Sequence, residues 1–126
     1  MDSNKIADVL DEAADLYESE RYDWCQGQAI SYDGLSICAS QALAMACGMK
    51  IRTRNRCPVD GCTHHVTVYN IQNFFDEDLY HQVRLTTDAA LNSSLIMFND
   101  ARGVGRTKQD IIDLFKNTAK ELRNGQ

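Results

Sequence analysis

The sequence contains no long apolar run, no internal repeat and no low-complexity or linker-like segment. None of its apolar stretches approaches the roughly 18 residues that a membrane-spanning helix needs, so we expect no span of a bilayer. The opening residues, Met1-Asp2-Ser3-Asn4, lack the basic start and the apolar middle of a secretory signal. We therefore expect a protein that stays in the cytoplasm.

An excess of basic residues is also missing. The 126 residues include 13 lysines and arginines against 18 aspartates and glutamates, which gives a net charge of −5. A general nucleic-acid-binding protein is normally basic overall, so this composition argues against that class. The charge is unevenly placed: residues 1–33 carry nine acidic and two basic side chains, whereas residues 50–56 carry four basic and no acidic ones.

The apolar fraction of 44% and the charged fraction of 25% are ordinary for a globular protein. The length suits one domain, 1–126, that buries enough surface to fold without disulfides. In a cytoplasmic protein the five cysteines do not predict a disulfide framework. Cys38 and Cys47 lie in an apolar stretch, where we expect them to behave as small buried hydrophobic residues.

Apolar residues recur at helical spacing in four segments, which predicts helices near 3–20, 36–47, 74–91 and 107–123. The first has one apolar stripe and acidic residues between, and the second is apolar nearly all round, so we place it centrally. Oxygen-bearing side chains at the predicted starts can cap exposed backbone N–H groups. These candidate caps are Asp2 or Ser3, Ser36, Asn73 or Asp76, and Thr107 with Asp110.

Two short segments have strand character instead. Residues 50–56 alternate strictly between basic and other residues, and residues 66–71 are almost entirely β-branched or aromatic. The Pro- and Gly-containing turn between them predicts a β-hairpin excursion at 50–71, too small to be stable alone. Residues 24–34 suggest a small hairpin or an irregular extended segment around Asp33-Gly34. The predicted fold is thus mainly α, a small domain of about four helices with a β-hairpin excursion.

Several segments, in the same order along the chain, resemble a family of small uncharacterised proteins from actinobacteria and their bacteriophages. They are Ala13-Ala14-Asp15-Leu16, Trp24-Cys25-Gln26-Gly27, Ile37-Cys38-Ala39, Phe98-Asn99-Asp100 and Arg106-Thr107. The chain departs from the family pattern at Ser40-Gln41, where Leu-Gly is common, and at Phe98, where Trp is common. The excursion around Cys57 and Cys62 resembles an insertion particular to this protein. The resemblance implies a helical architecture and a phage or actinobacterial origin, and it supplies no mechanism.

The turn of the hairpin contains a candidate metal site. Four residues separate Cys57 from Cys62, and His64 and His65 follow. Thiolate and imidazole ligands suit a structural zinc ion, with either histidine as third ligand and the other histidine, His81 or Cys25 as fourth. A second Cys-x-x-Cys pair is missing, so the alternatives are two reduced thiols with exposed histidines or, less favoured in the cytoplasm, a disulfide.

The basic strand contains a candidate partner-binding surface. Alternate residues of a strand share a face, so Lys50, Arg52, Arg54 and Arg56 are expected to project together. Such a row can contact an acidic protein surface or phosphates. It can also be a charged edge that protects a strand from aggregation, which is the interpretation we favour on sequence alone.

A third candidate is a small polar pocket formed by Trp24, Cys25, Gln26, Asn99 and Asp100. No adjacent base with recognisable spacing accompanies the thiol, so nothing in the sequence assigns catalytic residues. Structural hydrogen bonds to the backbone are the alternative that we favour. Taken together, these features favour an accessory protein, phage-encoded, that binds a protein of host or phage. A small-molecule binder or enzyme using the polar pocket and a nucleic-acid binder using the basic strand remain the alternatives.

Overall fold

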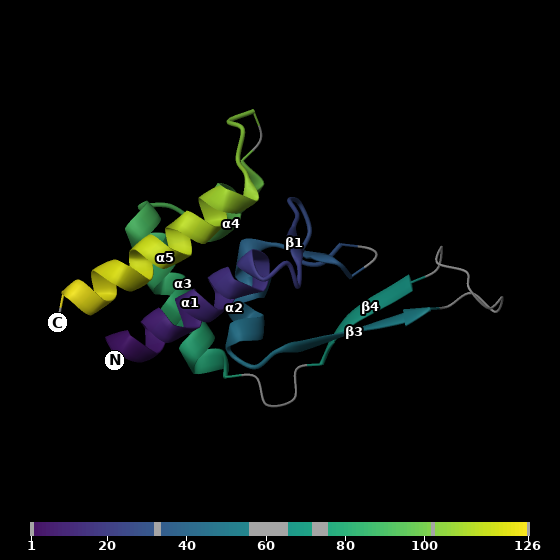
Figure 1. Ribbon diagram of the computed structural model, residues 1–126, viewed down its shortest axis with the longest axis horizontal. Coiled ribbons are helices and arrows are strands. Elements are labelled where there is room, and N and C mark those ends of the chain that lie inside the picture. Colours follow the sequence, from purple (N-terminus) through teal and green to yellow (C-terminus); the bar gives the residue numbers. More distant parts are fainter. Residues whose placement is uncertain (1, 32–33, 56–65, 72–75, 102, 126) are drawn as a thin grey trace.

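The first and the last helix of the chain pack against each other, so its two ends lie on the same side of the molecule (Figure 1). The computed structural model describes residues 2–31, 34–55, 66–71, 76–101 and 103–125. Its elements are α1 (Ser3–Glu18), β1 (Asp23–Trp24), β2 (Ser36–Ile37), α2 (Ala39–Ala46), β3 (Lys50–Asn55), β4 (Val66–Ile71), α3 (Glu77–Leu91), α4 (Leu95–Asp100) and α5 (Lys108–Asn124). The predicted fold, mainly helical with a small β excursion, is confirmed. None of these helices combines the length and the apolar character needed to cross a bilayer.

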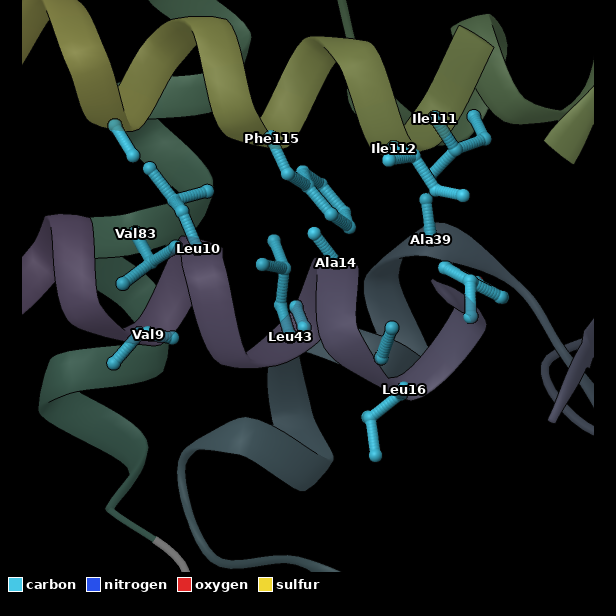
Figure 2. Packing of buried hydrophobic residues seen from close by; sticks show 14 of the residues in the cluster. Val9, Leu10, Ala14, Leu16, Ala39, Leu43, Val83, Ile111, Ile112 and Phe115 are labelled. Atoms are coloured by element: carbon cyan, nitrogen blue, oxygen red, sulfur yellow. The ribbon is translucent and has the colours of Figure 1, made fainter. Parts of the chain in front are cut away.

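The core lies between α1, α2 and α5, because each contributes an apolar stripe. Figure 2 shows Ile112 and Phe115 of α5 pointing toward Leu10 and Ala14 of α1, and all four are buried. Leu43 and the small residues Ala39 and Ala42 of α2 pack against this pair, and the small side chains let the helices approach closely, as expected for a central helix. Burying a side chain of the size of leucine or phenylalanine contributes about 1.5 to 3 kcal/mol.

Three of the predicted helix starts are confirmed by their caps. The Asp2 carboxylate accepts hydrogen bonds from Asn4 N (3.0 Å) and Lys5 N (3.3 Å) ahead of α1. Asp76, rather than Asn73, caps α3. Thr107 and Asp110 form a reciprocal capping box at α5, in which each side chain accepts from the backbone N–H of the other.

The predicted start of the second helix is wrong. We expected Ser36 to cap a helix from residue 37, but α2 begins at Ala39. Residues Ser36 and Ile37 instead form β2, which pairs in parallel with β1, so Ser36 lies opposite Asp23 and Ile37 opposite Trp24. The pairing partner is twelve or more residues away in sequence, so local pattern could not reveal it.

The segment between β1 and β2 partly matches its prediction. An antiparallel bridge joins Ile30 to Ile37, and Ser31 N donates to Ser36 O (2.9 Å), as in a narrow hairpin. The predicted turn residue Asp33 lies outside the described residues. The segment 94–98, for which no conformation was predicted, forms the start of α4, capped by Ser94.

The predicted excursion forms an antiparallel pair, β3 with β4. Figure 1 shows this pair extending away from the helices, and its two strands contact each other far more than they contact any helix. The register places Lys50 opposite Ile71, Arg52 opposite Tyr69 and Arg54 opposite Thr67. We refer to this pair of strands as the β arm.

Candidate functional site

The polar residues predicted to form a pocket do come together, but their polar groups bond to one another. Trp24 Nε1 donates to Asn99 Oδ1 (2.6 Å), and Gln26 Nε2 donates to the backbone oxygens of Asn99 (3.0 Å) and Ala101 (3.2 Å). Gly27 N donates to the Asp100 carboxylate (2.9 Å). We call these residues, Trp24, Gln26, Gly27, Asn99 and Asp100, the Asn99 cluster.

Asn99 is the centre of this cluster and is 2% exposed. Besides accepting from Trp24, its Oδ1 accepts from Ala39 N (2.9 Å) at the first turn of α2. Its Nδ2 donates to Cys25 O (3.1 Å) and to Asp100 Oδ1 (2.9 Å). An asparagine side chain has two donor hydrogens and two acceptor lone pairs, so every hydrogen-bonding position of Asn99 is used. The cluster therefore ties the end of α4 to the β1 segment and to the start of α2.

Contacts between Phe98 of α4 and Arg106 also connect this region to the start of α5. Arg106 Nε donates to Phe98 O (3.0 Å), and its guanidinium lies 3.6 Å from the centre of the Phe98 ring. The Trp-Cys-Gln-Gly, Cys-Ala, Phe-Asn-Asp and Arg-Thr segments are thus adjacent in space. Their shared role in the described structure is to hold helix ends together.

A cavity of about 230 Å³ lies beside the Asn99 cluster. It is lined by Gly27, Gln28, Ala29, Cys38, Ser40, Ile96, Asn99 and Asp100. Pockets that hold drug-sized ligands usually measure about 300 to 1,000 Å³, so this cavity is small. The hydrogen-bonding groups of Asn99 that could have lined it are already occupied by protein partners.

The β arm carries the predicted basic row. Because alternate positions of a strand share a face, Lys50, Arg52 and Arg54 occupy one face of the arm. Lys50, at the base of the arm, is exposed. The fourth predicted member, Arg56, lies outside the described residues. We keep the name basic row for the three described positions.

A cleft of about 360 Å³ opens at the base of the arm, between the end of α1 and the end of α2. Its lining consists of Glu12, Leu16, Arg21, Tyr22, Met45, Ala46, Gly48, Met49 and Lys50. The lining combines apolar side chains with two basic ones, Arg21 and Lys50, and the acidic Glu12. Lys50 is also the first residue of the basic row, so the cleft begins where the row begins.

The predicted metal site falls on residues outside the described part of the chain, namely Cys57, Cys62, His64 and His65. The two further candidate ligands are described: His81 is exposed on α3, and Cys25 lies beside the Asn99 cluster. Among the described residues, no group of three or more histidine, cysteine, aspartate or glutamate side chains lies close enough to hold a metal ion. The zinc site stays a prediction.

Two buried groups have altered acidity. Burial raises the pKa of the Cys47 thiol to about 12, and the nearby carboxylates of Asp76 and Glu12 add to the rise. Burial also raises the pKa of Tyr17 well above its usual value; its hydroxyl donates to Ile37 O (2.9 Å) inside the core. Both groups are therefore neutral at physiological pH and act as packing and hydrogen-bonding residues.

Comparison with known protein families yields one match, a family of unknown function (DUF6197), over residues 1–121. The chain belongs to this family. The match covers nearly the whole chain, which confirms membership of an uncharacterised family. No curated protein and no solved structure is similar enough to the chain to count as a match.

Within this member of the family, sequence reasoning found the Asn99 cluster and the basic row but missed the cleft. Its apolar lining includes Leu16 in α1, Tyr22 after α1, and Met45 and Met49 at or just after the end of α2. Each of these residues fits an ordinary apolar pattern, so only their packing reveals that they line a cleft. A weak sequence signal was available: Arg21 and Lys50 each flank one of these apolar segments.

Proposed function

We propose that this chain is a binding protein that holds an acidic segment of another protein on the basic row and in the adjoining cleft. The observation that supports this most is the position of Lys50, which lines the cleft and is also the first residue of the basic row. The setting we infer is the one that the resemblance implies, the cytoplasm of an actinobacterium, with a phage-encoded protein acting on a host or phage component.

The chemistry of the surface favours a peptide over a nucleic acid. Carboxylates of a partner would meet the basic row, and an apolar side chain of the same segment would enter the cleft, where methionines adapt easily to different shapes. A phosphate backbone offers charge but no apolar side chain for the cleft.

The Asn99 cluster supports the alternative, a small-molecule site, less well. Its side chains bond to each other and to backbone groups, and the adjoining cavity is small. The proposed zinc ion at Cys57, Cys62 and one of the two following histidines would have a supporting role. It would hold together an arm that is too small to be stable alone.

Purified protein and labelled probes can test the proposed function. The probes are a short glutamate-rich peptide with central leucines, the same peptide with serines instead, and a single-stranded oligonucleotide of similar length. Fluorescence anisotropy compares the wild type with the triple variant Lys50→Gln, Arg52→Gln, Arg54→Gln. The matched control is Thr53→Glu, Asn55→Glu, Asn70→Glu, which changes the net charge equally but on the opposite face of the arm.

We expect the leucine peptide to bind more tightly than the serine peptide, because only the first fills the cleft. Exposed charge pairs contribute roughly 0.2 to 1 kcal/mol each, so losing three should weaken binding about tenfold in the triple variant. The control should bind nearly as the wild type does. Tighter binding of the oligonucleotide than of the leucine peptide, or equal loss in both variants, would contradict the proposal.

A further inference from the structure

Two cysteines occupy neighbouring positions where the parallel pair of β1 and β2 ends. Trp24 lies opposite Ile37 in the register, and Cys25 and Cys38 are the next residue of each segment. Cys25 N donates to Ile37 O (3.2 Å), so the two segments are still side by side at this point. Adjacent strands lie about 4.8 Å apart, and a disulfide requires about 4.4 to 6.8 Å between its Cα atoms.

The two sulfur atoms also face the same surroundings. Cys25 Sγ donates to Gln28 O (3.5 Å), and the Cys38 side chain lines the small cavity together with Gln28 and Ala29. The backbone supports this arrangement, since Cys38 N donates to Ala29 O (2.9 Å).

Cys25 and Cys38 differ from Cys47 in their surroundings, because the first is partly exposed and the second borders a cavity. Cys25 is half-buried, and Cys38, although only 9% exposed, borders the cavity and lies 3.4 Å from Ser40 Oγ. Cys47 is 7% exposed, and burial raises its pKa to about 12, so its reactive thiolate is scarce. The described part of the chain therefore contains one pair of adjacent, reachable thiols and one inert thiol.

We propose that Cys25 and Cys38 are a redox modification site at which a peroxide forms an intramolecular disulfide. The sulfur of Cys25, the more exposed thiol, attacks one peroxide oxygen and breaks the O–O bond, which gives a sulfenic acid and one water. The sulfur of Cys38 then attacks the sulfur of Cys25. The displaced hydroxide takes the proton of the Cys38 thiol and leaves as a second water. Two thiols are oxidised and one peroxide is reduced to two waters.

The bond would reinforce a junction that the Asn99 cluster already holds. Asn99 Nδ2 donates to Cys25 O, and Asn99 Oδ1 accepts from Ala39 N, the residue after Cys38. The contacts of the thiols with Gln28 O (3.5 Å) and Ser40 Oγ (3.4 Å) are weak ones, because sulfur is a weak donor and acceptor. Closing a loop of this size should raise the melting temperature by about 5 to 10 °C, since part of the stabilisation is lost to local adjustment.

Peptide mapping of the full-length protein tests the site without any substitution. Reduced protein is treated with hydrogen peroxide, remaining thiols are alkylated, and the chain is cut with trypsin and with a protease that cleaves after acidic residues. Trypsin alone leaves Cys25, Cys38 and Cys47 in one peptide, because residues 22–49 contain no lysine or arginine. Cleavage after Asp33 separates the first cysteine from the other two, so a disulfide appears as two joined peptides.

We expect Cys25 joined to Cys38 in monomeric protein, with Cys47 alkylated only after denaturation. Cys25→Ser should remove the peroxide-dependent rise in melting temperature while leaving the reduced protein's melting temperature nearly unchanged. The matched control Cys47→Ala should keep the rise. The proposal is overturned if Cys25 is found as a sulfinic acid with Cys38 still alkylatable, or if Cys25 forms disulfides only between two copies of the chain.

Discussion

Replacing Asn99 by alanine should destabilise the whole domain, because one side chain joins three segments. The variant leaves Ala39 N without a partner at a buried helix start, and it removes the partners of Trp24 Nε1 and Cys25 O, which are partly buried. A buried group left unpaired costs about 1 to 3 kcal/mol, and a partly exposed one costs less because water can replace the partner. We expect a total loss of about 3 to 4 kcal/mol.

For a chain of this length, 1 kcal/mol corresponds to about 4 °C in melting temperature, so Asn99→Ala should melt about 12 to 16 °C lower. Circular dichroism measures the global transition. Trp24 is the only tryptophan in the chain, so its fluorescence reports on the cluster directly. Its emission in the folded variant should shift to longer wavelength, as water replaces Asn99 as the partner of the indole N–H.

Asn117→Ala is the matched control, because Asn117 is exposed in the middle of α5. The same chemical change there should leave the melting temperature nearly unaltered, since surface substitutions usually act within about 0.5 kcal/mol. If Asn99→Ala melts within a few degrees of the control and its Trp24 emission is unchanged, the cluster does not hold the three segments together, and the reasoning is refuted.

The remaining predictions concern a cap, a buried thiol and the metal site. Thr107→Ala removes one half of the capping box of α5 and should cost about 1 kcal/mol in thermal unfolding; an unchanged melting temperature would show that the cap is dispensable. The pKa of Cys47 is about 12 in the folded chain, against an ordinary value of 9.0. The unfolded chain therefore releases this proton first, and the stability present below pH 9 should fall by about 1.4 kcal/mol per pH unit above it. Denaturant titrations between about pH 8 and pH 10 should show this loss in the wild type and not in Cys47→Ala; equal slopes would contradict the assigned pKa. Protein purified without chelator should carry about one zinc ion per chain, which Cys57→Ser with Cys62→Ser should release while the helical core stays folded. Elemental analysis without metal would end that prediction.

Helices were the part of this fold that local pattern could predict. The stripe of α1, the acidic and hydroxyl caps at Asp2, Asp76 and Thr107, and the apolar face of α5 depend on residues within one or two turns of each other. The alternation in residues 50–56 predicted a strand for the same reason. These local preferences are kept in the folded chain because the tertiary packing of these segments does not override them.

Pairings between residues far apart in the sequence decided the features that local pattern did not predict. The start of α2 was predicted two residues too early. Residues Ser36 and Ile37 pair in parallel with β1, and no local sequence pattern predicts this pairing. The sequence predicted that the five pocket residues lie together. Only the tertiary structure showed that every hydrogen-bonding group of the Asn99 side chain has a partner within the protein.

The sequence by itself determined the helical class, the caps of α1, α3 and α5 and the alternating basic row, since each depends on the spacing of nearby residues. Tertiary structure alone decided that Lys50 lines a cleft with residues of α1 and α2 and that Cys25 lies beside Cys38. Both are contacts between segments far apart along the chain. Their geometry depends on how α1, α2 and the β1–β2 pair pack, which is a property of the assembled core and not of any single segment.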